Sequence, residues 1–332
     1  MPVSQVVSRY DWITYHEPEG HLDSLAETLS RLPGLTKDST IGAVTYKDDT
    51  LVERLDKFGF KKHWRLDPQA DLSITDPRAG LETIQERLTA KAAQNKRPLA
   101  DLLVVRHILE HAYDTGAFGS ALKALVKPGG YIVFELPDNA RCFETFDYGA
   151  IWEEHVLYFT PGTFKSFLAR KGFELFDFRV YPYPMEDSLV AIVKPSAASA
   201  PAAASPEEKR RAQLYVQGLS GASAKFRGIL KPYPREQTAL FGAGHRSEVF
   251  INLLGLKDCI GMVIDDDANK RGLFMPGSRL PIMGSAALIE KGVRLCLLNM
   301  SSESERRVVA KNKAFSDKGG RFVSIFPGRV EA

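Results

Sequence analysis

Apolar residues gather in short runs along the chain, and longer amphipathic stretches separate these runs. Residues 101–106 and 131–136 are runs of this kind, rich in Leu, Val and Ile, as buried strands are. A helix-like segment joins them and ends at the sequence Lys-Pro-Gly-Gly, residues 127–130. A strand, a helix, a glycine turn and a second strand in this order predict part of a parallel α/β sheet.

The same alternation continues toward both ends of the chain. Leucines three and four residues apart predict an amphipathic helix over residues 21–32. Residues 40–60 then predict a strand, a polar loop and a helix, and a second strand is expected over residues 64–68. Further strands are expected at residues 173–180, 188–193, 238–241, 262–264, 295–298 and 322–326, and further helices at 81–91, 163–171, 207–230, 249–254 and 285–291. The predicted fold class is α/β, with two Rossmann-like three-layer domains that each hold a mostly parallel sheet.

A segment of small residues divides this pattern in two. Residues 196–206 read SAASAPAAASP and hold no large apolar side chain, so they are expected to form a linker. A chain of 332 residues is also long for a single hydrophobic core. We therefore predict a first domain over residues 1–195 with an aromatic N-terminal arm, a linker over 196–208 and a second domain over 209–332.

Composition and charge narrow the class of protein. Hydrophobic residues make up 44% and charged residues 26% of the chain, which is ordinary for a soluble globular protein. The net charge of +3 gives no basic excess, so nucleic acid is not an expected partner. Neither a membrane span nor a signal peptide is predicted. The three cysteines lie far apart without a CxxC pair, so they predict no metal site, and a reducing cytoplasm is the expected location.

Titratable residues follow both central strands. His107, Glu110 and His111 come after the first strand, and Glu154 and His155 lie in a polar, aromatic loop beyond the second. In open parallel sheets, ligands bind outside the carboxyl ends of the strands, so both groups are candidate site residues. The alternatives are a structural helix start for the first group and a surface loop pair for the second.

Asp67 ends the strand predicted over residues 64–68. An acid at the end of a second parallel strand commonly accepts hydrogen bonds from ribose hydroxyls, which makes Asp67 a candidate cofactor ligand. The alternative is an ordinary Asp-Pro turn.

The second half of the chain carries a glycine-rich turn that suggests another function. Gly242 and Gly244 follow a strand, and Asp265 comes about 20 residues later, as in a dinucleotide-binding fingerprint, although Ser247 replaces its third glycine. Three interpretations stay open: a Rossmann-like domain without nucleotide, a nicotinamide-dependent oxidoreductase, and an anion or sugar-phosphate contact at the helix start, helped by Arg246.

An aromatic arm occupies the first 20 residues and includes Tyr10 and Tyr15. It is expected either to pack on the surface of the first domain or to form a lid over a ligand pocket. Tyr158, close to His155, belongs either to the core or to the site.

Segments of residues 40–193 resemble a class I S-adenosylmethionine-dependent methyltransferase. Those of the first half are RLDP (65–68), ADLLVVRHILEH (100–111), LVKPGGYIVFELP (125–137) and LARKGFELFDF (168–178). Residues 209–328 resemble the C-terminal domain of the deoxysugar, or nucleotide-sugar, C-methyltransferases. This second likeness is carried by FGAGHRS (241–247), VIDDDANKRGLFMPGSRLPI (263–282) and, in the first half, EEHVLYF (153–159).

The resemblance implies S-adenosylmethionine as the cofactor and a small molecule, such as a nucleotide-linked keto sugar, as the substrate. The residues expected to bind the cofactor are Gly42, Asp67, His107, Glu110 and His111. The residues expected to bind the substrate are Tyr10, Tyr15, Trp152, Tyr158, His245 and Arg246. His155 is the expected base for C-methylation next to a ketone, because histidine titrates near neutral pH, and Glu154 would orient it or contact the substrate.

Three departures from the family keep rival functions open. The loop after the first strand, IGAVTYKDDT, keeps only Gly42 of a Gly-x-Gly-x-Gly pattern, and Trp152 stands where the subfamily tends to have tyrosine. The cysteine-rich zinc module that usually begins these enzymes is absent, so zinc is not expected. One rival is a non-catalytic or repurposed methyltransferase fold that serves as a binding partner, and the other is a nicotinamide-dependent enzyme that uses the turn at Gly242.

Overall fold

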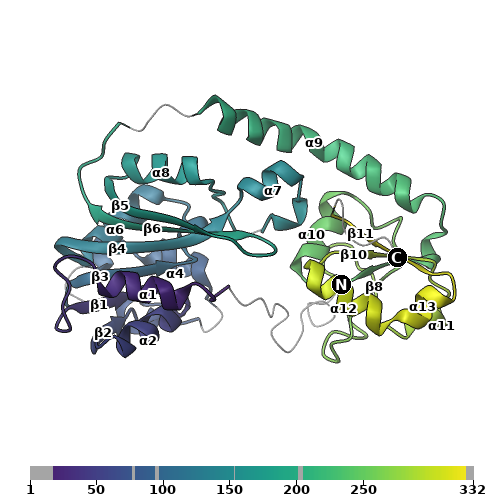
Figure 1. The fold of residues 1–332 in the computed structure, drawn as a ribbon, viewed down its shortest axis with the longest axis horizontal. Coiled ribbons are helices and arrows are strands. Elements are labelled where there is room, and N and C mark those ends of the chain that lie inside the picture. Colours follow the sequence, from purple (N-terminus) through teal and green to yellow (C-terminus); the bar gives the residue numbers. More distant parts are fainter. Residues whose placement is uncertain (1–17, 77–78, 94–96, 153, 201–204, 327–332) are drawn as a thin grey trace. The chain divides into compact units, whose positions relative to one another are not determined.

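A computed structural model describes residues 18–76, 79–93, 97–152, 154–200 and 205–326 (Figure 1). These residues form two compact units. The first unit contains residues 18–141 and 154–209, and the second contains residues 142–152 and 210–326. The segment 142–152 therefore belongs with the second half of the chain, although the sequence placed it in the first domain.

A six-stranded sheet with the strand order β2-β1-β3-β4-β6-β5 forms the centre of the first unit. Its strands are β1 (Thr40–Ala43), β2 (Lys62–Arg65), β3 (Ala100–Arg106), β4 (Val126–Asp138), β5 (Phe173–Tyr181) and β6 (Asp187–Pro195). Strands β1 to β4 are parallel, and β6 runs antiparallel to its neighbours β4 and β5. The sheet is thus mostly parallel, as the sequence predicts.

Helices cover both faces of this sheet (Figure 1). They are α1 (Leu22–Ser30) and α2 (Asp49–Lys57) on one face, and α4 (Leu81–Arg87), α6 (Thr115–Ala124) and α8 (Pro161–Arg170) on the other. Side chains of β3 alternate between the two cores: Leu102 and Val104 pack with α1 and α2, whereas Leu103 and Val105 pack with the other three helices. This alternation produces the predicted three layers.

The second unit repeats the architecture with five parallel strands in the order β11-β10-β7-β8-β9. The strands are β7 (Thr238–Phe241), β8 (Met262–Ile264), β9 (Ile282–Met283), β10 (Leu295–Leu298) and β11 (Arg321–Ser324). The helices are α9 (Pro206–Leu230), α10 (His245–Leu253), α11 (Ala287–Glu290), α12 (Ser302–Lys311) and α13 (Lys313–Asp317). Two hydrophobic clusters lie on opposite faces of this sheet, one with α9 and α10 and the other with α11 and α13.

The predicted fold class is confirmed, and the differences concern single elements. Helix α9 is one continuous helix that begins at Pro206, inside the segment predicted to be a linker. Helix α10 begins at His245, four residues before the predicted start. Among the described residues, four α-helices have no counterpart among the predicted elements: α3 (Pro68–Leu72), α7 (Ala140–Thr145), α12 and α13. Each holds at most two large apolar side chains, so the periodicity of the sequence gave little sign of them.

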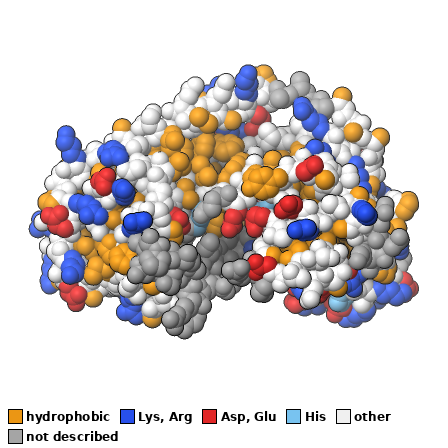
Figure 2. All heavy atoms as spheres, turned by 180° about the vertical axis from the view of Figure 1, so that it is seen from behind, with side chains coloured by type: hydrophobic (Ala, Val, Ile, Leu, Met, Phe, Trp, Pro, Cys, Tyr) orange, Lys and Arg blue, Asp and Glu red, His pale blue; other side chains and the backbone are white. Residues whose placement is uncertain are grey.

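Charges of both signs are interleaved on the face drawn in Figure 2, in keeping with the net charge of +3. Acidic side chains lie among Lys and Arg across this face. Within the part of the chain that the structure describes, no helix has the length and apolar character that a membrane span requires.

Gly42 lies inside β1, not in the loop that follows it. A Cβ atom added at this position would lie 2.6 Å from Cζ2 of Trp64 and 2.9 Å from Cδ1 of Leu103. Glycine is therefore needed here so that the indole of the neighbouring strand β2 can cross β1. The structure gives Gly42 a packing role, and this differs from the predicted contact with a cofactor.

Replacing Gly42 with alanine should lower the free energy of unfolding by about 1–3 kcal/mol, because the added methyl group overpacks the contact with Trp64. Urea unfolding followed by circular dichroism would measure this change. Gly221→Ala is the matched control, since a Cβ at Gly221 in α9 meets nothing within 4 Å. Equal stability of the Gly42→Ala protein and the unmodified protein would contradict the packing role.

Candidate active site

The order of the strands reverses between β1 and β3. The chain runs from β1 outward to β2 and then returns to form β3 on the other side of β1. In open α/β sheets, ligands bind at such a point, outside the carboxyl ends of the strands. Residues 44–48 and 107–111 leave these two ends, so the candidate site is built from these two loops.

Asp48 closes the loop after β1. Its fully buried carboxylate accepts hydrogen bonds from the amides of Val44 and Thr45 at Oδ2 and from the amide of Arg106 at Oδ1, each at 2.7 Å. Burial raises the pKa of Asp48 to about 7, although the three amides and the Arg106 charge favour the charged form. The amides of this loop are thus bound by the protein's own side chain, and the loop is tied to the end of β3.

Glu135 is the centre of a buried group of charges. Arg106 Nε donates to Glu135 Oε2 at 2.6 Å, and both side chains are almost fully buried. The Nε2 atoms of His21 and His107 lie 3.1 and 3.4 Å from Oε1 of the same carboxylate. Burial acts to raise the pKa of Glu135, but the two histidines and Arg106 outweigh it and hold the pKa well below its usual range.

His107 turns the chain away from the end of β3. Its φ angle of 51° lies in the left-handed region, which is uncommon for residues other than glycine and is often found at functional sites. Its amide donates to the carbonyl of Glu135 at 2.9 Å. Its Nδ1 atom lies 3.6 Å from Oε1 of Glu110. The strained residue therefore connects the buried charges around Glu135 with the outer group around Glu110.

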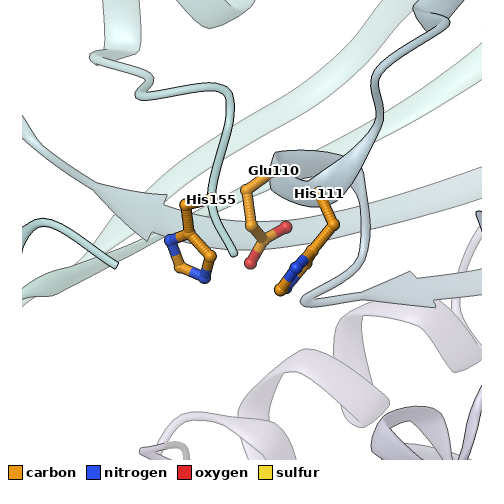
Figure 3. A group of neighbouring side chains, drawn as sticks. All are labelled: Glu110, His111 and His155. Atoms are coloured by element: carbon orange, nitrogen blue, oxygen red, sulfur yellow. The ribbon is translucent and has the colours of Figure 1, made fainter. Parts of the chain in front are cut away.

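Three predicted residues come together at the outer side of this network. Glu110 and His111 lie on one short helical turn, η3 (Leu109–His111), and His155 lies on the loop after β4 (Figure 3). One donor atom from each of the three side chains lies within 4.8 Å of the others. The rings of His111 and His155 meet edge to face, with centroids 4.7 Å apart. The structure thus brings together candidates that the sequence had named as two separate groups, from segments that are distant along the chain.

The backbone fixes the loop that carries His155. The amides of Val156 and Leu157 both donate to the carbonyl of Glu110, at 2.9 and 3.0 Å. Glu110 thus holds the loop through its main chain and faces His155 through its side chain. Glu154, the predicted partner of His155, is exposed, and His155 itself is partly buried.

The carboxylate of Glu110 lies close to both imidazole rings (Figure 3), and the residue is only 2% exposed. Burial acts to raise its pKa, but His107, His155 and His111 together hold the pKa below its usual value. Among the described residues, its Oε2 atom has no hydrogen-bond partner. On the far side of the cluster, Oε1 of Glu82 lies 2.9 Å from Nδ1 of His111.

Two further acids stand at carboxyl ends of strands in this unit. Asp67 is exposed just after β2 and caps the short helix α3 (Pro68–Leu72) by accepting a hydrogen bond from the amide of Ala70 at 2.7 Å. Burial raises the pKa of Asp138, at the end of β4, to about 6, while the amide of Ala140 opposes this shift. The position of Asp67 suits the predicted ribose contact, which stays a prediction.

Trp152, His245 and Arg246, predicted to bind substrate, come together in the second unit. The indole of Trp152 stacks on His245 with centroids 3.6 Å apart and an interplanar angle of 3°. Nε2 of His245 lies 2.7 Å from the carbonyl oxygen of Ile151, and Arg246 pairs with both carboxylate oxygens of Asp147. These contacts hold the segment 142–152 on α10, and substrate binding by the three residues stays a prediction.

The glycine turn of the second unit is closed by its own acid. Oδ2 of Asp265 accepts a hydrogen bond from the amide of Ala243 at 2.8 Å, and Lys270 lies 3.6 Å from the same oxygen. A carboxylate engaged in this way favours the interpretation of a Rossmann-like domain without nucleotide over the nicotinamide interpretation.

Sequence reasoning missed the inner part of the network, namely His21, Asp48 and Glu135. The sequence did carry a signal for Glu135: it is a charged residue inside an apolar strand, and such a residue is rarely buried without a partner. Asp48 is one of several polar residues in its loop, so the sequence gave no reason to single it out. Tyr10 and Tyr15 lie outside the described residues. Tyr158 is partly buried, and its ring centroid lies 6.3 Å from that of His155.

Two family models match separate parts of the chain. A model described as a methyltransferase domain matches residues 50–177, and a model described as a C-methyltransferase C-terminal domain matches residues 222–327. The first match contains the end of β3, the residues 107–111 and His155, but it begins after β1 and the loop of Asp48. The second match contains the sheet of the second unit. The predicted resemblance of both halves is therefore confirmed.

Among curated proteins, the chain is similar to the C-methyltransferase NovU of Streptomyces niveus, with 24% identity over 284 residues, 79% of this chain and 66% of NovU. The chain thus spans just under two thirds of that relative. Among solved structures, N-methyltransferase NodS from Bradyrhizobium japonicum is 15% identical with a TM-score of 0.36, over 54% of this chain and 97% of NodS. A putative methyltransferase from Bacillus halodurans is 12% identical with a TM-score of 0.38, over 52% of this chain and 100% of that protein.

Replacing Glu135 with alanine should lower the free energy of unfolding by about 3–5 kcal/mol, because it leaves the buried charge of Arg106 without its partner. Urea unfolding at neutral pH would measure the loss. Glu174→Ala, at an exposed position of β5, should change stability by no more than about 0.5 kcal/mol. A Glu135→Ala protein as stable as this control would show that the buried pair does not stabilise the fold.

Proposed function

We propose that this chain, whose two halves match a methyltransferase domain and a C-methyltransferase C-terminal domain, is an S-adenosylmethionine-dependent C-methyltransferase. The observation that carries the proposal is the joint presence of the two matches, in order, on one chain. The site agrees with it, because the histidines and acids lie at the carboxyl ends of the strands where the strand order reverses.

Methylation of carbon requires a carbon nucleophile. A C–H group next to a carbonyl becomes nucleophilic when a base removes its proton, and the resulting enolate carbon can attack the methyl group of the sulfonium. The new C–C bond forms as the C–S bond breaks, and S-adenosylhomocysteine leaves. The proposed substrate is therefore a small ketone, and a nucleotide-linked keto sugar is the form that the family resemblance favours.

His155 is the residue we assign as the base. Histidine can accept a proton near neutral pH, and a positioned base typically contributes 10²–10⁴-fold to a rate. The loop that carries it is held by the hydrogen bonds from Val156 and Leu157 to the carbonyl of Glu110. Glu154, next to it and exposed, is in a position to contact the substrate. Holding two reactants in one site supplies much of the remaining acceleration.

The cofactor is proposed to lie across the ends of β1, β2 and β3. Asp67 would accept hydrogen bonds from the ribose hydroxyls, since it is exposed directly after β2. His107, Glu110 and His111 would line the other side. The three cysteines are free thiols, as expected of a protein that works in the reducing cytoplasm, which is the location we propose.

A second candidate function is a methyltransferase fold that no longer transfers methyl groups. One observation favours it: Asp48 binds the amides of Val44 and Thr45, where the family has a glycine-rich loop that approaches the cofactor. Cofactor binding decides between the two functions.

Calorimetric titration with S-adenosylmethionine should show binding to the unmodified protein and weaker binding to Asp67→Ser. Serine can cap α3 as Asp67 does, but it has no carboxylate to accept hydrogen bonds from the ribose hydroxyls. Glu53→Ala, an exposed acid on α2, is the control and should bind as the unmodified protein does. Absence of binding to the unmodified protein would favour the second candidate function.

Replacing His155 with alanine should lower turnover of a nucleotide-linked keto sugar by about 10²–10⁴-fold, with cofactor binding retained. The release of S-adenosylhomocysteine would measure turnover. Exchange of the substrate's acidic proton in deuterated water, with S-adenosylhomocysteine in place of the methyl donor, would measure proton removal alone. His63→Ala, at an exposed position of β2, serves as the control. Unchanged turnover in the His155→Ala protein would remove the assignment of the base.

A further inference from the structure

Glu110, His111 and His155 have a property that proton transfer by His155 does not require: their donor atoms converge. One donor atom of each side chain lies within 4.8 Å of the other two, and the three side chains come together at one place (Figure 3). We propose that these three residues bind a divalent transition-metal cation of the zinc type.

The donor set fits such an ion. Two imidazoles and one carboxylate are a common ligand set for zinc, cobalt and ferrous iron, and three protein ligands leave a position open for water or substrate. Hard cations such as magnesium prefer oxygen ligands and fit this set poorly. The sequence gave no sign of a metal site, because its cysteines are far apart and these ligands come from η3 and from the loop before α8, which are distant along the chain.

Glu110 supplies an observation that points independently to a cation. Its side chain is 2% exposed, and Oε2 has no hydrogen-bond partner within the described part of the chain. Its other oxygen faces Nδ1 of His107 at 3.6 Å. A buried carboxylate oxygen without a partner is costly, and a bound cation would satisfy it.

Glu82 supplies a second observation. Its carboxylate lies 2.9 Å from Nδ1 of His111. The contact is an ion-pair distance without the geometry of a hydrogen bond. A carboxylate so close to Nδ1 favours a proton on that nitrogen, which leaves the lone pair of Nε2 for a metal, and metal-binding histidines commonly have such a carboxylate neighbour. Glu82, His111 and the proposed metal position, where the donor atoms of Glu110, His111 and His155 converge, follow that pattern.

The site is also held in place before any ion binds. The amides of Val156 and Leu157 fix the loop of His155 to the carbonyl of Glu110, and His107 contacts both Glu110 and Glu135. Ligands that are already positioned lose little conformational freedom on binding.

The site has a consequence for catalysis, which rests on the proposed function. A nitrogen lone pair that binds a cation cannot accept a proton, so His155 cannot be base and ligand at the same time. A cation on this site would therefore inhibit methyl transfer, and a chelator would restore it.

Calorimetry with zinc chloride on the full chain, freed of metal by a chelator, tests the site without any substrate. We expect one equivalent to bind with heat that is lost in His111→Ala and His155→Ala. Glu110→Gln keeps the shape of the side chain but removes its charge, and should weaken binding by at least on the order of 10–100-fold. His63→Ala, at an exposed position, should bind as the unmodified protein does.

Glu82→Gln keeps the test independent of folding, because Glu82 is partly exposed and is not itself a proposed ligand. It should weaken zinc binding by on the order of 10–100-fold. The melting temperature measured in chelator checks that each variant is folded. Absence of binding to the unmodified protein, or equal binding by the unmodified protein, His111→Ala and Glu110→Gln, would overturn the proposal, since the ion would then bind elsewhere.

Activity measurements separate this proposal from the proposed function. If the chain transfers methyl groups, zinc should inhibit it, and the ratio of rates without and with zinc should be smaller for Glu82→Gln than for the unmodified protein. Zinc that binds the cluster without slowing turnover would overturn the inhibitory role. A chain that binds zinc and never transfers methyl groups would remove the proposed function and leave the metal site standing.

Discussion

The first unit depends on a buried ion pair between two neighbouring strands. Arg106 ends β3, and Glu135 lies directly opposite it in the register of β4. Both charges are removed from water, which costs several kcal/mol per ion unless the partner and further hydrogen bonds compensate. His21 at the start of α1 and His107 at the end of β3 lie beside the Glu135 carboxylate. Nη1 of Arg106 donates to the carbonyl of Lys47 and to the hydroxyl of Thr50. The pair therefore fixes the carboxyl ends of the central strands relative to one another.

The same charges determine how the site is arranged. From Glu135 outward, acids and histidines alternate: Glu135 contacts His107, His107 contacts Glu110, and Glu110 clusters with His111 and His155. Each carboxylate keeps its charge because an imidazole or guanidinium lies beside it. Moving any member would leave a neighbour buried and uncompensated. The outer residues are thus held by the inner ones, which provides a preorganised site without a bound ligand.

The sequence predicted the layers well because their cause is local. Period-two alternation in β3 and the spacing of leucines in α1 follow from burial of one face, and both are visible in the chain itself. It also named residues near His107 and near His155 as site candidates, since both groups follow carboxyl ends of strands, but it did not predict that Glu110, His111 and His155 would form one cluster. It could not predict the role of Asp48 or His21, because their partners are distant in sequence and nothing in their local pattern marks them. The family pattern suggested that Gly42 contacts the cofactor, whereas in the structure close packing against Trp64 explains why a glycine stands at this position.

The two units show why glycine in the loop after the first strand is a poor guide to ligand binding in this chain. The loop after β1 has lost the glycines, and the loop after β7 has kept Gly242 and Gly244. In both, an acid of the same unit binds the amides: Asp48 holds Val44 and Thr45, and Asp265 holds Ala243. An amide that already donates to a carboxylate offers little to a phosphate or a methionine group, whatever the residue that carries it. In each unit an acid, Asp48 in the loop after β1 or Asp265 after β8, has taken that role. The clustered titratable groups at the switch point of the first unit come from the end of β3 and from the loop of His155. The chemistry of this chain should therefore be sought at Glu110, His111 and His155, and the glycine pattern carries no weight for or against it.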